Sequence, residues 1–192
     1  MPKKIFLIFL IVVITAVLVL ILFGKPKENK KTIITRSIEK SQNCPIKIEE
    51  KIVRGNSLEP LIKDGETIEV LFGYYDCHPI ERNDIVIYFY AGNENPIIKI
   101  IKGITGDKFS LKKTNNGWYI LINGEILKNS ENQPYIFDDQ GYRLLSLYEK
   151  DYKRIIPEDA YLILGNLPQG SLDSSHFGLV GKKDILGKVR VK

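Results

Sequence analysis

The chain contains 192 residues, of which 44% are hydrophobic and 27% are charged, and it carries a net charge of +5. This balance is typical of a folded globular protein and excludes a wholly disordered chain. The basic excess is concentrated in residues 25–31, outside any predicted folded element. That placement argues against a nucleic-acid-binding protein and favours attraction to anionic lipid headgroups.

An apolar segment occupies the N-terminus. Residues 5–23 carry no charge and contain one hydroxyl group, that of Thr15. A helix of about 20 apolar residues crosses the hydrocarbon core of a bilayer. The sequence Gly24-Lys25-Pro26 follows without the small-residue pattern of a signal-peptide cleavage site, which favours an uncleaved anchor. We therefore predict an anchor helix in residues 1–24, a Lys-rich linker in 25–45 and a β-rich domain in 46–192.

The remainder of the chain has the pattern of a β protein. Alternating apolar and polar residues and a high β-branched content predict strands. The predicted strands cover residues 47–53, 67–72, 84–90, 96–102, 108–112, 118–122, 161–164 and 187–191. Asn115-Asn116-Gly117 and Asn123-Gly124 are hairpin turn signals, because Asn and Gly tolerate the positive φ of such turns. A short helix is predicted over residues 144–152.

A candidate nucleophile lies just after the first predicted strand. Gly55 permits a sharp turn, Ser57 projects from it, and Pro60 restricts the backbone that follows. A serine nucleophile needs an exposed, rigid position with free backbone N–H groups beside it. The same pattern also fits an ordinary turn serine, so the assignment requires a second feature.

Lys99 supplies that second feature. It sits in the apolar run 97–101, and strand alternation places it on a partly buried face. Burial lowers the pKa of a lysine, and a neutral amine can accept the proton of a serine hydroxyl. The alternative is an edge-strand lysine that extends to solvent. Lys102 falls on the opposite face, directly before Gly103, and we expect it to be a solvated end residue.

The two cysteines, Cys44 and Cys77, bracket the Ser57 segment. They form no C-x-x-C pair, and the cysteines and the two histidines lack the spacing of a zinc site. Two buried thiols are one interpretation. A Cys44–Cys77 disulfide is the other, and it is favoured if the domain lies outside the cytoplasm. We predict neither a metal nor a cofactor.

Taken in order, these segments resemble the type I signal peptidase family. Residues 55–60 resemble its (G or S)-x-S-M-x-P box, with Leu58 in place of Met, and residues 82–86 resemble its R-G-D-I-V box. Residues 99–107 resemble its K-R-V-I-G-L-P-G-D box, so the family's general base falls on Lys99. Residues 171–178 resemble the S-x-D-S-R-x-x-G end of its last box.

The resemblance implies a serine endopeptidase of mostly β fold, with an N-terminal transmembrane helix followed by a single antiparallel β-sheet catalytic domain of signal-peptidase type. Ser57 would be the nucleophile and Lys99 the general base. Ser171, which would orient the Lys99 amine, and Asp173 would support them. A signal peptide would bind as an extended strand and be cut after small residues. The implied substrate-binding positions are Val53, Gly55, Ile97 and Ile98.

The last box departs from the family pattern. It begins G-D-N-R in the family but reads Gly165-Asn166-Leu167-Pro168 here, and its later Arg is Ser175. Both arginines that would pair with Asp173 are therefore absent. A buried unpaired carboxylate is costly, so we expect Lys182, Lys183 or backbone N–H groups to take their place.

The resemblance implies a monomeric single-pass protein of the cytoplasmic membrane, with its N-terminus inside and its catalytic domain outside. Its partners would be secreted preproteins and the lipid bilayer, with no nucleic acid. Lysines flank the apolar segment on both sides, so the positive-inside rule gives conflicting signals on orientation. Two other functions stay open. One is a specialised peptidase for a single pilin-type or conjugation substrate, and the other is a non-catalytic, membrane-tethered peptide-binding module.

Overall fold

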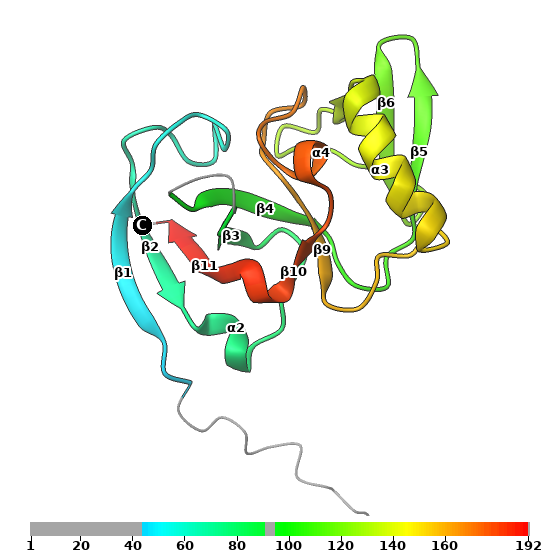
Figure 1. Ribbon diagram of the computed structural model, residues 1–192. Coiled ribbons are helices and arrows are strands. Elements are labelled where there is room, and N and C mark those ends of the chain that lie inside the picture. Colours follow the sequence, from blue (N-terminus) through cyan, green and yellow to red (C-terminus); the bar gives the residue numbers. More distant parts are fainter. Residues whose placement is uncertain (1–43, 91–94, 192) are drawn as a thin grey trace, which may run out of the picture. The chain divides into compact units, whose positions relative to one another are not determined.

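The computed structural model describes residues 44–90 and 95–191 (Figure 1). The predicted anchor and all but the end of the predicted linker lie outside these residues. Within the described ranges, no helix has both the length and the apolar character needed to cross a bilayer.

Most strands belong to one antiparallel sheet of seven strands. The register places Ile52 of the first strand opposite Thr67 of the second, and Lys99 opposite Val86. The strands, in spatial order, are β1 (Lys47–Ile52), β2 (Thr67–Phe72), β11 (Ile185–Val191), β3 (Ile85–Tyr88), β4 (Ile97–Gly103), β9 (Ala160–Leu164) and β10 (Val180–Gly181).

A second antiparallel sheet of four strands holds the rest, so the β-rich domain contains two sheets rather than one (Figure 1). Its core is the predicted hairpin, which turns at residues 115–116 as the Asn-Gly signal indicated. The strands are β5 (Phe109–Thr114), β6 (Gly117–Ile122), β7 (Glu125–Ile126) and β8 (Ile136–Phe137).

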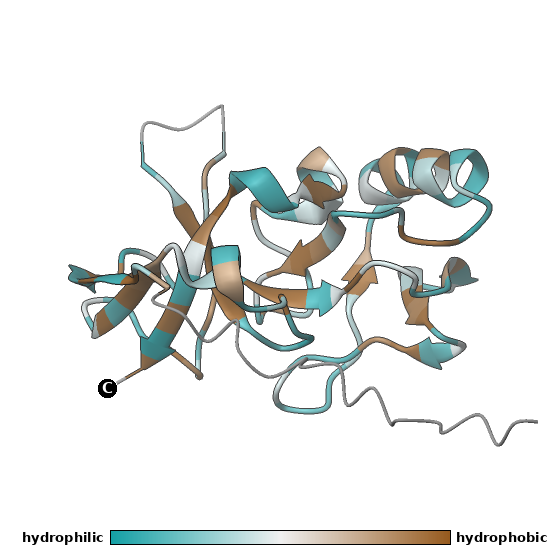
Figure 2. Ribbon diagram, turned by 90° about the horizontal axis from the view of Figure 1, so that it is seen from below, coloured by the Kyte–Doolittle hydropathy of each residue, from teal (hydrophilic) through white to brown (hydrophobic). Residues whose placement is uncertain are grey.

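Four short or medium helical segments complete the domain: α2 (Tyr74–Cys77), α3 (Asp139–Asp151), α4 (Ser174–Phe177) and the 3-10 turn η1 (Lys182–Asp184). Helix α3 starts five residues before the start of the predicted helix, because the Asp138 carboxylate caps it by accepting the Gly141 N–H. It ends at Asp151, one residue before the predicted end. In Figure 2, apolar and polar residues alternate around α3, and its buried Leu145 joins the core of the smaller sheet.

Strand β9 contributes side chains to two of the three apolar clusters of the core. Tyr161 and Ile163 pack in one apolar cluster, whereas Leu162 and Leu164 pack in the cluster beneath the smaller sheet. Successive side chains of a strand point to opposite faces, so a strand buried on both faces reads as a continuous apolar run. A third cluster, which includes Leu58, lies beneath the Ser57 turn.

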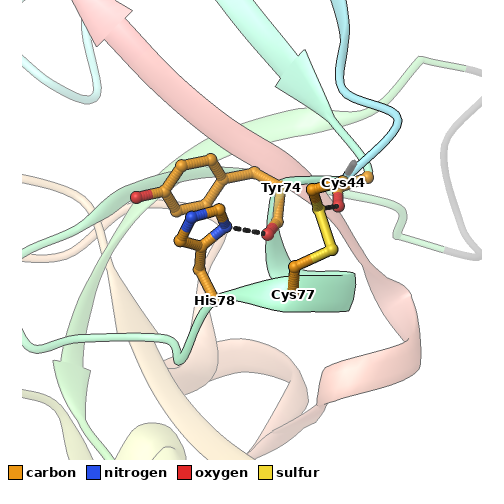
Figure 3. Close-up of a disulfide and its surroundings, with 5 residues drawn as sticks. Cys44, Tyr74, Cys77 and His78 are labelled. Carbon is orange, nitrogen blue, oxygen red and sulfur yellow. Dashed lines mark hydrogen bonds between the residues drawn. A yellow bond between two sulfur atoms is a disulfide. The ribbon is translucent and has the colours of Figure 1, made fainter. Parts of the chain in front are cut away.

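Cys44 and Cys77 form a disulfide that ties the residues before β1 to helix α2 (Figure 3). The bridge closes a loop with a sequence separation of 33 residues, and a loop of that length stabilises a fold by about 3–4 kcal/mol through chain entropy. Beside it, the Tyr74 and His78 rings are stacked with centroids 4.1 Å apart. The two ends of the segment that carries Ser57 are therefore joined covalently to each other.

Candidate active site

The turn that carries Ser57 is held by backbone and side-chain hydrogen bonds. Val53 pairs with the two residues just before β2, donating to Glu66 O at 2.8 Å and accepting from the Gly65 N–H at 3.0 Å. Gly55 has a φ of +91°, a region that favours glycine, and its N–H donates to Asp64 Oδ1 at 2.7 Å. Leu58 is 2% exposed and anchors the turn in the core.

Lys99 reaches this turn from β4. Its Nζ lies 2.9 Å from Ser57 Oγ and 3.0 Å from the Ile98 carbonyl oxygen. The side chain is buried, with 3% of the residue exposed. Burial lowers the pKa of Lys99 to about 8, and the charge of Asp173 opposes this shift. A substantial fraction of the amine is therefore neutral near pH 8 and can accept the Ser57 hydroxyl proton at the observed distance.

Asp173 is buried, and donors other than the expected lysines surround it. Its Oδ2 accepts the Gly165 N–H at 3.0 Å and the Ser171 hydroxyl at 2.8 Å. Its Oδ1 accepts both the N–H and the hydroxyl of Ser175, at 3.0 and 2.8 Å. Two backbone amides and two hydroxyls thus satisfy the carboxylate in place of the arginines that are absent from this sequence. The sequence suggested the backbone donors but not the hydroxyls.

Ser171 does not hydrogen-bond to the Lys99 amine directly. Its hydroxyl donates to Asp173, and among the described residues no hydrogen bond joins it to Lys99. Gly165 packs tightly between Ser171 and Ser57. A Cβ at this position would collide with Ser171 Oγ and with the Ser57 carbonyl oxygen. Ser171 contacts Asp173, and it is the Asp173 charge that raises the pKa of Lys99.

A groove of about 410 Å³ opens beside Ser57 and Lys99. One wall is the segment from Val53 to Gly55, and the other includes Ile97 and Ile98 of β4. Strand β9 pairs with β4 only from Ile100 onward, and β1 is the terminal strand of its sheet. Both walls therefore lie along strand edges, and a strand edge is where proteins bind an extended peptide.

The expectation for Lys102 was wrong. The residue is 7% exposed, and its Nζ donates to Asn83 Oδ1 at 3.2 Å and to the Lys128 carbonyl oxygen at 3.3 Å. A register shift between Ile101 and Gly103 interrupts the alternation on which the expectation rested. Lys102 joins the two sheets and lies on the Tyr135 ring instead of facing solvent.

Sequence reasoning also missed Tyr135 and Asn166. The Tyr135 hydroxyl donates to the Gly165 carbonyl oxygen at 2.6 Å, and Asn166 donates to the Ser57 carbonyl oxygen. The altered last box was the available signal for Asn166. In the described part of the chain, no three His, Cys, Asp or Glu side chains gather as metal ligands. His176 is exposed and contacts Ser175, away from the dyad.

Comparison with known proteins identifies the family of the chain. Residues 44–192 match the family described as signal peptidase, peptidase S26. Signal peptidase IB of Staphylococcus aureus (strain COL) is 29% identical over 148 residues, which cover 71% of this chain and 73% of that protein. Signal peptidase I of Bacillus caldolyticus is 30% identical over 141 residues, which cover 72% and 75%.

The crystal structure of a signal peptidase I from Enterococcus faecalis V583 aligns with a TM-score of 0.40 at 26% identity, over 59% of this chain and 98% of that one. The family assignment does not depend on that structure. It rests on the sequence match, which covers the whole of the domain that contains Ser57 and Lys99. The chain therefore belongs to the signal peptidase family, peptidase S26.

Proposed function

We propose that the chain is a membrane-bound signal peptidase, which cleaves the signal peptides of exported preproteins after small residues through a Ser57–Lys99 dyad. The observation that carries the proposal is the 2.9 Å contact between Ser57 Oγ and the buried Lys99 Nζ. The S. aureus and B. caldolyticus relatives are named signal peptidases, which supports the same substrate class.

In the first half of the reaction, neutral Lys99 takes the proton of the Ser57 hydroxyl while Ser57 Oγ attacks the scissile carbonyl carbon. The Lys99 ammonium then returns that proton to the leaving amine, and an ester of Ser57 remains. In the second half, Lys99 takes a proton from water, and the resulting hydroxide attacks the ester. The proton returns to Ser57 Oγ as the C–O bond breaks, so each half consumes and releases one proton.

The Ser57 backbone N–H supports the developing oxyanion. Among the described residues none accepts a hydrogen bond from it, so it is available to the substrate. Gly55 provides no side-chain donor, and its own N–H is engaged by Asp64. Backbone donation from the nucleophile turn therefore carries this task, and the hydrogen bonds that fix the turn preorganise it.

The substrate binds between the two groove walls as an added strand. Val53 uses its backbone groups toward Gly65 and Glu66, so those of Ile52 and Arg54 face the groove. Ile97 and Ile98 form the opposite wall, and Gly55 leaves the approach to Ser57 open. Backbone pairing would give affinity, and shallow apolar pockets would select small side chains at the −1 and −3 positions.

The location completes the proposal. We place the chain in the cytoplasmic membrane as a single-pass monomer, with its N-terminus inside and its catalytic domain outside. The anchor-like apolar run 5–23 supports the membrane attachment. The Cys44–Cys77 disulfide supports an oxidising compartment for the catalytic domain.

The activity should depend on pH through Lys99. Its pKa is lowered to about 8, and only the neutral amine acts as a base, so kcat/KM should rise about tenfold per pH unit below that value and level off above it. The measurement is kcat/KM between pH 6 and 10, with circular dichroism as the control for an intact fold. Half-maximal activity below pH 7 would indicate a different base and contradict the assignment.

A test of the substrate class uses the detergent-solubilised full chain and a preprotein with one A-x-A site. Mass spectrometry should locate the cut directly after the second Ala, and replacement of both Ala residues by Phe should prevent it. Efficient cutting of several unrelated preproteins would exclude the specialised single-substrate enzyme. Binding without any cut would favour the peptide-binding module instead.

A further inference from the structure

Asn166 holds the backbone on both sides of the residue that follows the nucleophile. Its backbone N–H donates to the Ser57 carbonyl oxygen at 2.6 Å, and its side-chain Nδ2 donates to the Glu59 carbonyl oxygen at 2.9 Å. Leu58 lies between these two carbonyls and is anchored in the core. One residue thus fixes the turn that presents Ser57 Oγ.

Both polar atoms of the Asn166 side chain are engaged in hydrogen bonds. Its Oδ1 accepts the Ser130 N–H at 3.0 Å, and its Nδ2 also donates to Ser130 Oγ at 2.7 Å. Its backbone oxygen accepts from Asn129 Nδ2 at 3.0 Å, and the residue is 1% exposed. A second rotamer would break several hydrogen bonds in a buried site at once, so the amide orientation is unique.

The position of Asn166 in the fold links Ser57 to Lys99. Strand β9 ends at Leu164, which pairs with Ile100, the residue that follows Lys99 on β4. Two residues after Leu164 the chain reaches Asn166. One short segment therefore contains both the end of the strand that pairs beside Lys99 and Asn166, whose two hydrogen bonds to the Ser57 turn we call the Asn166 clamp. Gly165, between them, donates to Asp173.

We propose that Asn166 is a positioning residue for peptide cleavage, whose amide sets the distance between Ser57 Oγ and Lys99 Nζ. The inference rests on the proposed function and extends it. The family box has an aspartate where this chain has Asn166. A carboxylate has no N–H to donate to the Glu59 carbonyl, and its oxygen would face that oxygen. The family residue cannot replace the amide in this chain.

Two substitutions separate hydrogen bonding from packing. Asn166→Ala keeps the backbone bond to Ser57 but loses the bond to Glu59, and kcat should fall about 3–10-fold. Asn166→Asp keeps the side-chain volume but sets an anionic oxygen against the carbonyl, and kcat should fall about 10–100-fold. KM should stay within about twofold in both, since Asn166 does not line the groove. A packing role predicts the opposite order of the two variants.

The matched control is Asn132→Asp, which adds the same charge at an exposed residue of the segment between β7 and β8 that also contains Ser130, the hydrogen-bond partner of Asn166. It should keep the wild-type kcat. The experiment measures kcat and KM of the detergent-solubilised full chain on the A-x-A preprotein, corrected for the folded fraction from thermal unfolding. The clamp is supported if Asn166→Asp loses more kcat than Asn166→Ala at unchanged KM.

The two levels of the proposal fail differently. A wild-type protein that cuts no preprotein overturns the proposed function, and this inference with it. An active wild type overturns the inference alone in either of two cases. In the first, Asn166→Ala retains kcat within twofold of wild type. In the second, the kcat losses of Asn166→Ala and Asn166→Asp are fully accounted for by the smaller folded fraction of each variant. If Asn166→Asp does not fold, Asn166→Ala decides between these outcomes.

Discussion

Replacing Lys99 with methionine should abolish peptide cleavage and make the domain more stable. Loss of the general base should lower the rate by about 10³-fold. At pH 6 the folded wild type must hold a charged amine in a buried site, and the lowered pKa of Lys99 records that cost. Methionine removes the charge but keeps the length, so the free energy of unfolding should rise by about 1–3 kcal/mol.

The pH dependence of this gain follows from linkage. Below pH 8 the Lys99 amine is charged in both the folded and the unfolded state, and the full penalty is present. Between about 8 and 10.5 the folded state releases its proton first, so wild-type stability rises with pH and the advantage of methionine shrinks. Denaturant unfolding of wild type and Lys99→Met at pH 6 and at pH 10 measures the difference in unfolding free energy at each pH.

Lys112→Met, at an exposed position of β5, is the matched control and should change neither activity nor stability appreciably. A Lys99→Met protein that cuts at the wild-type rate would show that Lys99 is not the base. A variant that is destabilised equally at both pH values would show that Lys99 carries no burial penalty.

Asp173→Asn should damage both the stability and the pH profile of the enzyme. The carboxylate accepts four hydrogen bonds, two of them from backbone N–H groups that cannot turn away. An amide offers one acceptor oxygen and places N–H donors against donors, so the free energy of unfolding should fall by about 2–4 kcal/mol.

The catalytic effect of Asp173→Asn has a definite direction. The Asp173 charge raises the pKa of Lys99, so its removal should lower that pKa further. The rising limb of kcat/KM should then move to lower pH, because the amine is neutral over a wider range. Asp151→Asn, exposed at the end of α3, is the control. An unchanged limb in a folded Asp173→Asn protein would contradict electrostatic coupling between the two groups.

The dyad could be predicted from sequence because each member carries a local signal. Ser57 stands in a Gly–Pro-bounded turn, and Lys99 interrupts an isoleucine run, so the chemistry of each residue is visible in its neighbours. Most strands of the larger sheet were predictable for the same reason, since alternation is a local property. The family resemblance placed the two residues in one site.

The parts that escaped prediction depend on contacts between distant segments. Alternation placed Lys102 in solvent, whereas a register shift and the smaller sheet bury it. The partition into two sheets likewise depends on which strands pair. The hydrogen bonds from Asn166 arise where the chain returns to the Ser57 turn more than 100 residues later, as in the Asn166–Glu59 bond with its separation of 107. Local propensity carries no information on such pairs.

The central claim, that Ser57 attacks the peptide bond, is tested most directly by the cleavage rate of the Ser57→Ala protein beside wild type at pH 9. The substitution removes one hydroxyl from the groove and leaves both of its walls unchanged, so the variant should fold and bind the A-x-A preprotein like wild type. The account predicts cutting by wild type and no detectable product from Ser57→Ala at matched thermal stability. Product formation by Ser57→Ala at the wild-type rate would contradict it.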